Sequence, residues 1–369
     1  MKILVLSSHT PSLFWFRIDM MKAFCTKGAT VIAVGPDKED LWSEKFAKEG
    51  IEYRSIPVSR NGLNVLSDIV TYKALKKLIK ELHPQKIFTY QAKTIVYGTL
   101  AAHSVDKQIE IYPLIAGLGS IFRGNGLKNT VIRTILGIQY RTAFKYAQKV
   151  IFQNEDDMSE LVGRNLLSRD KCRIINGSGV NTDKFGIAEL PKQKAILFIG
   201  RLIGDKGVRE YLELARRIKE RRENVRCLLV GPFDSNPSAI SKEELQPYID
   251  DNIIEYFGEQ KDVRPYLAQC TVYVLPSYHE GTPKTVLEAM SIGRPIVTTN
   301  APGCRETIKD GINGYLVPVK DVDSLETGVI RILNSPTLAS DFSIESRKIA
   351  VEKYDVNKIN ASIIDIMNL

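Results

Sequence analysis

The sequence has few cysteines and no long apolar segment. Its five cysteines are scattered over 369 residues and form no CxxC pair. This spacing argues against a disulfide framework and against a zinc site, and it favours buried thiols in a reducing cytoplasm. No run of about 18 apolar residues occurs, so no transmembrane helix is predicted. The apolar stretch at the N-terminus is also too short to predict a signal peptide.

The excess of positive charge is confined to the first half of the chain. Residues 1–190 contain 27 Lys and Arg against 18 Asp and Glu, whereas residues 191–369 contain 24 against 25. Two interpretations stay open: an ordinary solvated surface, or a surface for an acidic partner such as a phosphorylated substrate or an anionic membrane. We expect no nucleic-acid partner, because no interleaved aromatic pattern typical of an RNA-recognition motif is present.

Short apolar runs alternate with helical patterns along the whole chain. Continuous Val, Ile and Leu runs are typical of strands buried on both faces, and their alternation with helices predicts parallel sheets. The length fits two domains of roughly 150 residues each. We therefore predict an α/β protein with two Rossmann-like doubly wound domains facing across a cleft. The predicted strands are 3–6, 30–35, 86–90, 111–117, 149–153, 195–200, 226–231, 272–276, 295–299 and 314–318.

The domain boundary is predicted from a break in this alternation. Residues 185–194 interrupt the pattern with Gly and Pro before the next strand. This indicates a first domain over 1–185 and a second over 186–344. The first helix is predicted from 17 to 27. One helix is predicted over about 340–366, and its length favours packing of the segment 345–369 back onto the first domain.

The strongest chemical signal is SYHEGTPKTVLEAM, residues 277–290. It follows a predicted strand and opens a helix, with Thr282 as the expected N-cap and Pro283 as the first helical residue. Gly281 allows close approach of a ligand, and the first amides of the helix, at Lys284 and Thr285, suit an anion such as a diphosphate.

Two glutamates flank this predicted anion site. Glu280 lies before the cap and Glu288 lies almost two turns into the helix. Carboxylates accept hydrogen bonds from sugar hydroxyls, so the pair suits a sugar nucleotide. The alternative is an acid on a surface loop and a solvated acid on a helix.

A second signal is FIGRLIGDKGV, residues 198–208. Arg201 follows the carboxyl end of a predicted strand, and Lys206 precedes a helix that begins near Gly207. Two cations in this position can neutralise a diphosphate leaving group, Arg through a bidentate fork and Lys as a point charge. The segment is not a Walker loop, because Asp205 stands where a second glycine is required. The alternative is two surface cations beside a turn.

Together these segments resemble the family 4 retaining glycosyltransferases of the GT-B fold. The family's two signature glutamates match Glu280 and Glu288, its Arg and Lys match Arg201 and Lys206, and the resemblance covers nearly all of residues 170–330. It implies that Arg201 and Lys206 bind the donor diphosphate, that Glu280 contacts the donor sugar, and that these three residues are catalytic. The implied donor-binding residues are Gly258, Glu259, Gln260, Gly281, Thr282, Lys284, Thr285 and Glu288.

The N-terminal half resembles a narrower set, bacterial N-acetylgalactosaminyltransferases that extend polyprenyl-diphosphate-linked glycans. SSHTPSLFWFR (7–17), IAGLGSIFRGNG (115–126) and DSNPSA (234–239) carry this resemblance. It makes the first domain the acceptor-binding one and the second the nucleotide-sugar-binding one. The sequence departs from much of the larger family in having no GG pair in its first loop, and Ala116 where many members have His or an acid. The implied acceptor-side residues are His9, Gly117, Gly119, Ser120 and Arg123.

The resemblance implies retaining, metal-independent transfer of N-acetylgalactosamine, or another hexose or N-acetylhexosamine, from a UDP-sugar to a polyprenyl-diphosphate-linked saccharide. The setting is assembly of a surface polysaccharide such as lipopolysaccharide O-antigen, on the inner face of the bacterial cytoplasmic membrane. No cofactor is expected. Asp321 and Asp323 match the DxD of metal-dependent transferases, but their place before a predicted helix favours an N-cap. The alternatives are a UDP-sugar epimerase of the same fold and a non-catalytic sugar-nucleotide binding module.

The stretch 127–150 suggests how such a protein contacts an anionic membrane surface. As one helix it places four basic residues on one stripe, with apolar residues nearby, which is typical of an interfacial helix. The alternative is a helix at the domain core whose basic edge is merely solvated. The basic residues are Arg133, Arg141, Lys145 and Lys149, and the apolar ones are Ile132, Ile135, Leu136 and Phe144.

Overall fold

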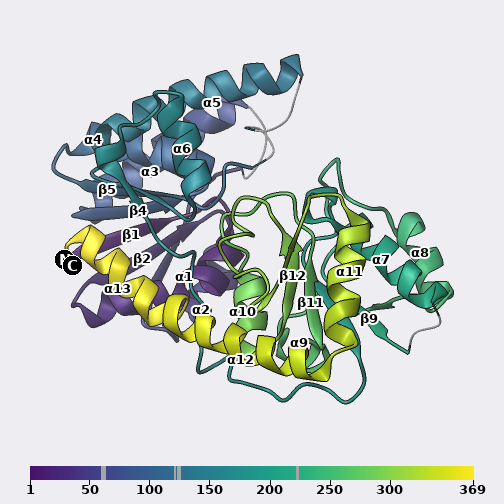
Figure 1. The fold of residues 1–369 in the computed structure, drawn as a ribbon. Helices are drawn as coiled ribbons and strands as arrows, with labels where there is room; N and C mark the ends of the chain where they lie inside the picture. The colour runs from purple at the N-terminus through teal and green to yellow at the C-terminus, as the bar shows by residue number, and fades with distance from the viewer. Residues whose placement is uncertain (60–63, 120–121, 123–125, 222–223) are drawn as a thin grey trace. The chain divides into compact units, whose positions relative to one another are not determined.

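The computed structural model describes residues 1–59, 64–119, 122, 126–221 and 224–369. They form two compact units (Figure 1). Unit 1 comprises Met1–Ser178 and Val356–Leu369, and unit 2 comprises Gly179–Asp355. Both units contain a parallel sheet with helices packed against it, so the α/β doubly wound class is confirmed.

Within its described residues, unit 1 has a parallel sheet of seven strands in the order β3-β2-β1-β4-β5-β6-β7. The strands are β1 (Lys2–Leu6), β2 (Thr30–Gly35), β3 (Glu52–Ser55), β4 (Lys86–Tyr90), β5 (Glu110–Ile115), β6 (Val150–Phe152) and β7 (Cys172–Ile174). The helices are α1 (Thr10–Thr26), α2 (Glu39–Ala47), α3 (Val65–Leu82), the π-helical η1 (Thr94–Gly98), α4 (Thr99–Val105), α5 (Leu127–Tyr146), α6 (Glu155–Gly163), the 3₁₀ turn η3 (Arg169–Lys171) and α13 (Val356–Met367).

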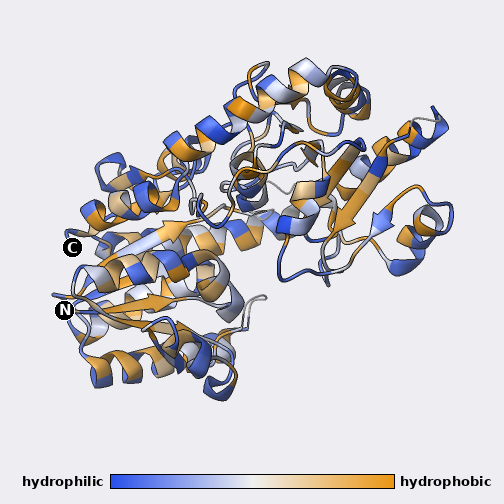
Figure 2. Ribbon diagram, turned by 90° about the horizontal axis from the view of Figure 1, so that it is seen from below, coloured by the Kyte–Doolittle hydropathy of each residue, from blue (hydrophilic) through white to orange (hydrophobic). Residues whose placement is uncertain are grey.

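The central strands of unit 1, such as β1, are apolar on both faces because helices cover both. Ile3 and Val5 pack in one core with α1 and α13, whereas Leu4 and Leu6 pack in another with α3 and α4. Figure 2 shows strands in orange and helices in alternating orange and blue, as this packing requires. α1 begins at Thr10, earlier than the predicted residue 17, because His9 is extended and Pro11 is well suited to a first helical turn.

Within its described residues, unit 2 has a parallel sheet of six strands in the order β10-β9-β8-β11-β12-β13. The strands are β8 (Ala195–Ile199), β9 (Arg226–Val230), β10 (Glu255–Tyr256), β11 (Val272–Leu275), β12 (Ile296–Thr299) and β13 (Gly314–Val317). The helices are the 3₁₀ turn η4 (Gly204–Lys206), α7 (Val208–Glu220), α8 (Lys242–Asp250), α9 (Arg264–Gln269), α10 (Lys284–Ile292), α11 (Val322–Leu333) and α12 (Pro336–Lys353).

The end of the chain is two helices, so the prediction of one helix over 340–366 is wrong. α12 ends before Tyr354 and belongs to unit 2, whereas α13 belongs to unit 1, where Ile359 and Ile363 join the core beside β1. The break occurs where Asp355 forms a β-bridge with Val180. The same contact assigns residues 179–185 to unit 2, whereas the sequence pattern put the boundary at 185. Composition shows where the alternation of apolar runs and helical patterns stops. The boundary between the two units depends instead on pairing between segments that are distant in the sequence.

Across the part of the chain that the structure describes, no helix combines the length and the apolar character that crossing a bilayer requires.

Candidate active site

The two strongest motifs of the sequence meet at the carboxyl edge of the unit 2 sheet. In the strand order, β8 lies between β9 and β11, so the chain leaves β8 and β11 toward opposite sides. Ligands of doubly wound sheets bind at such a switch point. η4 follows β8, and the segment 277–283 follows β11, so Lys206 and Glu280 both lie there.

Lys206 and Glu280 form an ion pair at this point. Ser277 Oγ donates a second hydrogen bond to the same carboxylate, at 2.8 Å. The two loops are also joined by their backbones, because the Tyr278 amide donates to Asp205 O at 2.9 Å. The cation and the acid are therefore held side by side before any ligand arrives.

Two glycines make this close approach of loops possible. Gly207, with φ of +74°, lies so near the end of β11 that an added Cβ would stand 2.1 Å from Pro276 O. Gly303, with φ of +80°, lies against the backbone of Glu280, where a Cβ would stand 2.1 Å from Glu280 O. Any other residue at either position would push a signature side chain out of place.

Arg201 also forms an ion pair, with a residue whose role the motif analysis missed. Its Nη1 lies 2.8 Å from Asp234 Oδ2. Arg201 follows β8 and Asp234 follows β9, so both lie at the carboxyl edge of the sheet. Asp234 begins the DSNPSA segment, in which the sequence alone predicts no partner for Arg201. A single acid after a predicted strand forms no recognisable pattern in the sequence. Only the strand order shows that β9, which precedes Asp234, lies next to β8.

The start of α10 differs from the prediction. Pro283, with φ of −71° and ψ of 107°, is the N-cap, and the helix begins at Lys284. The prediction of Thr282 as the cap and Pro283 as the first helical residue is therefore wrong by one position. Proline fits the cap because an N-cap needs no amide hydrogen, and the first turn still places the amides of Lys284 and Thr285 at the positive end of the helix.

Glu288 is buried on α10, which rules out a solvated helix acid. Its side chain is 8% exposed. Burial raises its pKa to about 7, against the opposing effect of Lys284 and Lys184. Gly258, Glu259 and Gln260 follow β10, and the loop is fixed by the Gly231 amide, which donates to Gly258 O at 2.8 Å, and by Gln260 Nε2, which donates to Phe257 O at 2.6 Å.

The DxD segment serves as a helix cap, as predicted. Asp321 is the N-cap of α11, and its Oδ1 accepts a hydrogen bond from the Ser324 amide at 2.9 Å. Asp323 forms an ion pair with Arg217 on α7. Both carboxylates are thus accounted for by local structure.

The acceptor-side residues predicted for the first domain lie in unit 1, where the structure describes them. His9 is the N-cap of α1, directly after β1, and its carbonyl accepts from the Ser12 amide at 3.1 Å. Gly117 and Gly119 follow β5 with φ of 128° and 71°. Ser120 and Arg123 lie outside the described residues. The carboxyl edge of the sheet thus receives His9 from β1 and the glycines from β5.

A polar cluster at the same edge was not recognised from the sequence. Unit 1 has its own switch point, between β1 and β4. Gln91, just after β4, accepts hydrogen bonds at Oε1 from Ser7 Oγ at 2.9 Å and from the amide and hydroxyl of Ser8, both at 2.8 Å. Tyr90 supports this cluster through a hydrogen bond of its hydroxyl with Ser12 Oγ at 2.8 Å. Single serines and a glutamine form no motif, so only the strand order brings them together.

The helix expected to contact a membrane differs in composition from the prediction. α5 ends at Tyr146, so Lys149 is not on it, and Arg133 is partly buried and donates to Phe122 O at 2.9 Å. The predicted stripe of four basic residues is therefore wrong. The exposed side of α5 has apolar residues followed by basic ones: Val131 (58% exposed), Ile135 (40%) and Ile138 (63%), and then Arg141 and Lys145.

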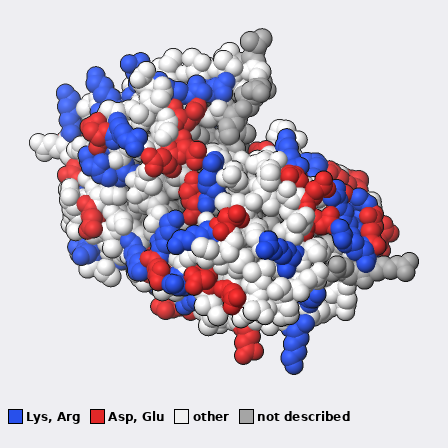
Figure 3. Space-filling model, in the orientation of Figure 1, with Lys and Arg blue, Asp and Glu red and all other residues white. Residues whose placement is uncertain are grey.

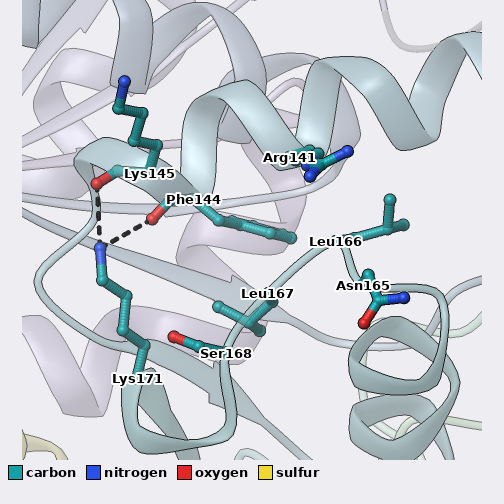
Figure 4. Close-up of a pocket in the computed structure, with 8 residues that line it drawn as sticks. All are labelled: Arg141, Phe144, Lys145, Asn165, Leu166, Leu167, Ser168 and Lys171. Atoms are coloured by element: carbon teal, nitrogen blue, oxygen red, sulfur yellow. Dashed lines mark hydrogen bonds between the residues drawn. The ribbon is translucent and has the colours of Figure 1, made fainter.

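Arg141 and Lys145 also border a pocket of about 320 Å³ at the C-terminal end of α5 (Figure 4). Phe144, Leu166 and Leu167 supply its apolar lining. Lys171 lies at the rim but is occupied, because its Nζ donates to the carbonyls of Phe144 and Lys145 and so caps the helix. Figure 3 shows Lys and Arg side chains gathered over the part of unit 1 that contains α5.

Comparisons with known proteins agree with this geometry. The family described as Glycosyl transferases group 1 matches residues 180–349, and the family described as Glycosyl transferase 4-like matches residues 2–154. Together the two matches cover most of the chain. The protein therefore belongs to the group 1 family of glycosyltransferases, with the GT-B fold.

Individual relatives cover the full length. The chain is 29% identical over 374 aligned residues to the N,N'-diacetylbacillosaminyl-diphospho-undecaprenol alpha-1,3-N-acetylgalactosaminyltransferase of Campylobacter jejuni, covering 97% of this chain and 96% of that one. Among solved structures it is similar to the sucrose-phosphate synthase of Thermosynechococcus elongatus, with a TM-score of 0.85, 17% identity and coverage of 100% and 98%. It is also similar to HepE of Anabaena in complex with UDP, with a TM-score of 0.79, 16% identity and coverage of 100% of both chains.

Proposed function

We propose that this glycosyltransferase moves a hexose or N-acetylhexosamine, N-acetylgalactosamine being the preferred candidate, from a UDP-sugar to a polyprenyl-diphosphate-linked saccharide, with retention and without a metal. The observation that carries the proposal is the arrangement of Arg201, Lys206, Glu280 and Glu288 around one switch point. The Campylobacter relative, which acts on an undecaprenyl-diphosphate-linked sugar, supports the acceptor class.

The two cations are suited to the donor diphosphate. Each is paired with a carboxylate, Lys206 with Glu280 and Arg201 with Asp234. A diphosphate that enters between them would take over the cations and leave Glu280 to accept hydrogen bonds from the donor sugar. The carboxylates thus keep both cations in place without a ligand, which lowers the reorganisation needed during the reaction.

Glu288 is suited to the ribose hydroxyls. Its carboxylate lies on α10, the helix whose first amides are proposed to bind the diphosphate, so the ribose and the diphosphate of one nucleotide fit the same element. The loop Gly258–Gln260 lies beyond β10 and is suited to the base. Gly281 and Thr282 lie between Glu280 and the start of α10 in the chain, and we propose them as further donor-binding residues.

The proposed chemistry needs no protein nucleophile. The bond between the donor anomeric carbon and the diphosphate oxygen breaks, and the acceptor hydroxyl oxygen bonds to the same face of that carbon. The proton of the acceptor hydroxyl passes to the departing phosphate. Charge therefore develops on the diphosphate, where Arg201, Lys206 and the first turn of α10 stabilise it.

The acceptor side belongs to unit 1 in this proposal. His9, Gly117 and Gly119 lie at the carboxyl edge of its sheet, and Ser120 and Arg123 are proposed with them on the strength of the resemblance alone. The exposed side of α5 is proposed to rest on the anionic inner face of the bacterial cytoplasmic membrane, with Val131, Ile135 and Ile138 in the interface, Arg141 and Lys145 near the lipid headgroups, and the pocket they border open to a headgroup phosphate.

The test is an assay with a panel of UDP-sugars and synthetic polyprenyl-diphosphate-linked saccharides, with the product anomer determined by NMR. We expect one donor to be strongly preferred and the product to keep the donor's anomeric configuration. Conversion of a UDP-sugar to its epimer without acceptor would favour an epimerase instead. Tight UDP-sugar binding with no turnover on any acceptor would favour a binding module.

A further inference from the structure

The carboxyl edge of unit 1 contains a buried cation that the proposed donor site does not use. Arg17 lies in the first half of α1 and is 3% exposed. Its Cζ lies over the ring of Tyr90, 5.2 Å from the ring centroid, and its Nε is buried without a hydrogen-bond partner. Burial lowers the pKa of Arg17 to about 10, so the guanidinium is still charged at neutral pH.

This charge has no counter-ion in the described part of the chain. The guanidinium forms no ion pair or hydrogen bond with any residue that the structure describes, and the ring of Tyr90 is its partner. Burying an arginine without a carboxylate is costly, because the lost hydration is replaced only by the weaker attraction of an aromatic face. Cations elsewhere in the protein, such as Arg201 and Lys206, are paired.

The surroundings of Arg17 are rich in hydrogen-bond donors. Tyr90 connects it to the switch-point cluster, since its ring lies under the guanidinium and its hydroxyl contacts Ser12 Oγ. The Ser8 hydroxyl donates to Gln91 Oε1 and the Gln91 side-chain amide donates to Ser12 Oγ, so a bound anion would receive these hydrogen bonds in exchange for the ones within the cluster. Helical side chains tilt toward the helix N-terminus, so Arg17 reaches toward the carboxyl edge of the sheet rather than away from it.

The backbone beside this cluster is held in an uncommon conformation. Gln91 has φ of +73°, which is unfavourable for a residue with a side chain, and the π-helical segment η1 follows it almost at once. π-helical segments are rare and occur often at functional sites. The strain is therefore consistent with a binding role at the end of β4, where Gln91 must face Ser7 and Ser8.

We infer that Arg17 binds the diphosphate of the lipid-linked acceptor, with Ser8, Ser12 and Gln91 as further donors. A guanidinium presents a planar fork that matches two phosphate oxygens, and a diphosphate would supply the missing counter-charge. The inference rests on the proposed function and adds a subsite to it. Arg201 and Lys206 in unit 2 are assigned to the donor diphosphate, so Arg17 in unit 1 is left for the acceptor diphosphate.

The direct test is calorimetric binding of short prenyl ligands to the whole protein at neutral pH, with saturating UDP to fill the donor site. The probes are geranyl diphosphate, geranic acid and geraniol. For wild type we expect the diphosphate to bind more tightly than the other two. For Arg17→Met we expect diphosphate affinity to fall roughly 10- to 100-fold, as loss of a charged hydrogen-bonded contact implies. Arg169→Met, which removes one exposed charge from unit 1, should bind like wild type.

Thermal unfolding separates this role from a structural one. If Arg17 is retained for binding, Arg17→Met should unfold at the same temperature as wild type or higher, because an uncompensated buried charge is removed. Arg17→Lys, which keeps the charge but loses the fork, should show intermediate affinity. A large fall in unfolding temperature for both variants would instead assign Arg17 to the core and overturn the inference.

Two further results would overturn it without touching the proposed function. One is equal affinity of wild type and Arg17→Met for geranyl diphosphate. The other is geranic acid binding as tightly as the diphosphate, which would point to an acceptor carboxylate. The transfer assay is independent of both, because it reports whether a diphosphate-linked saccharide is an acceptor at all.

Discussion

The two sheets of this protein treat positive charge at their switch points in opposite ways. In unit 2 the cations Arg201 and Lys206 are paired with acids, and Glu288 is a buried acid. In unit 1 the cation Arg17 is buried against an aromatic ring with no carboxylate among the described residues. The whole units differ in the same way, because unit 1 has an excess of basic residues and unit 2 does not. Unit 1 has 27 Lys and Arg against 17 Asp and Glu, and unit 2 has 24 against 26.

In the proposed function, this difference suits the two units to two kinds of ligand. A soluble nucleotide sugar carries both a diphosphate and many hydroxyls, so unit 2 offers cations and carboxylates together. A lipid diphosphate near an anionic surface carries mainly negative charge, and Arg17 of unit 1 is a buried cation without a paired acid among the described residues. The predictions below test this contrast, from the largest expected effect to the smallest.

Removing either of the two cations at the unit 2 switch point, Arg201 or Lys206, should have the largest effect on turnover. Arg201→Ala and Lys206→Ala are each expected to lower turnover by roughly 10²–10³, because each group stabilises charge that develops on the departing diphosphate. Lys206→Ala also removes the cation that is paired with Glu280, so its effect should be the greater one. Steady-state kinetics of both variants, with unfolding temperatures close to wild type, measure this. Near-normal turnover would remove both residues from the site.

Glu288→Gln should change donor affinity and its dependence on pH. With a pKa of about 7, the carboxylate of wild type ionises as pH rises through neutrality, and the ionised form accepts hydrogen bonds from the ribose more strongly. The donor KM of wild type should therefore fall between pH 6 and pH 8, whereas the variant should show a flat profile and about tenfold higher KM at pH 8. Parallel profiles would contradict the assignment.

The raised pKa of Glu288 also predicts how protein stability depends on pH. Rising pH should strengthen donor binding but lower the free energy of unfolding. Because the folded-state pKa lies above the ordinary value of 4.5, the folded protein holds this proton more tightly than the unfolded chain does. Stability from this group is therefore full below about pH 4.5 and declines as pH rises to about 7. Glutamine does not ionise, so the stability of Glu288→Gln should fall less between pH 5 and pH 7.5 than that of wild type. Unfolding midpoints in denaturant at these two pH values measure the difference.

Reversing two basic charges on α5 should have a moderate effect, which is confined to the binding of the protein to membranes. Each basic residue near an anionic surface contributes about 1 kcal/mol, so Arg141→Glu together with Lys145→Glu should weaken binding to anionic liposomes by well over tenfold at low salt. Activity on a short, soluble acceptor should stay unchanged. Co-sedimentation with anionic and neutral liposomes measures this, and equal binding of wild type to both lipids would leave the charge of unit 1 unexplained.

Chelation should have the smallest effect. If two cations and a helix end neutralise the donor diphosphate, EDTA should leave the transfer rate unchanged within about twofold. Asp321 is engaged as a helix cap and Asp323 in an ion pair, so neither acid is positioned to demand a metal. Loss of activity with EDTA, restored by Mn²⁺ or Mg²⁺, would require a new account of the donor site.

The sequence by itself determined the fold class and located the two segments that are proposed to bind the donor. Apolar runs such as those of β1, β8 and β11 favour strands buried on both faces, since they are too short for helices and leave no polar side for solvent. The segments around Lys206 and Glu280 were recognisable because each joins a strand end to a helix start within a few residues. Asp321 was identifiable as a cap for the same reason, because a cap is a local arrangement.

What the tertiary structure decided depends on contacts between distant segments. The partner of Arg201 follows a different strand, the break between α12 and α13 occurs where Asp355 pairs with Val180, and the end of α5 at Tyr146 is stabilised by Lys171. The cluster of Arg17, Tyr90 and Gln91 exists because β1 and β4 are neighbours in the sheet, although more than 80 residues separate Ser7 from Gln91. Residue spacing along the chain records local geometry, whereas burial and pairing are set by which strands lie side by side.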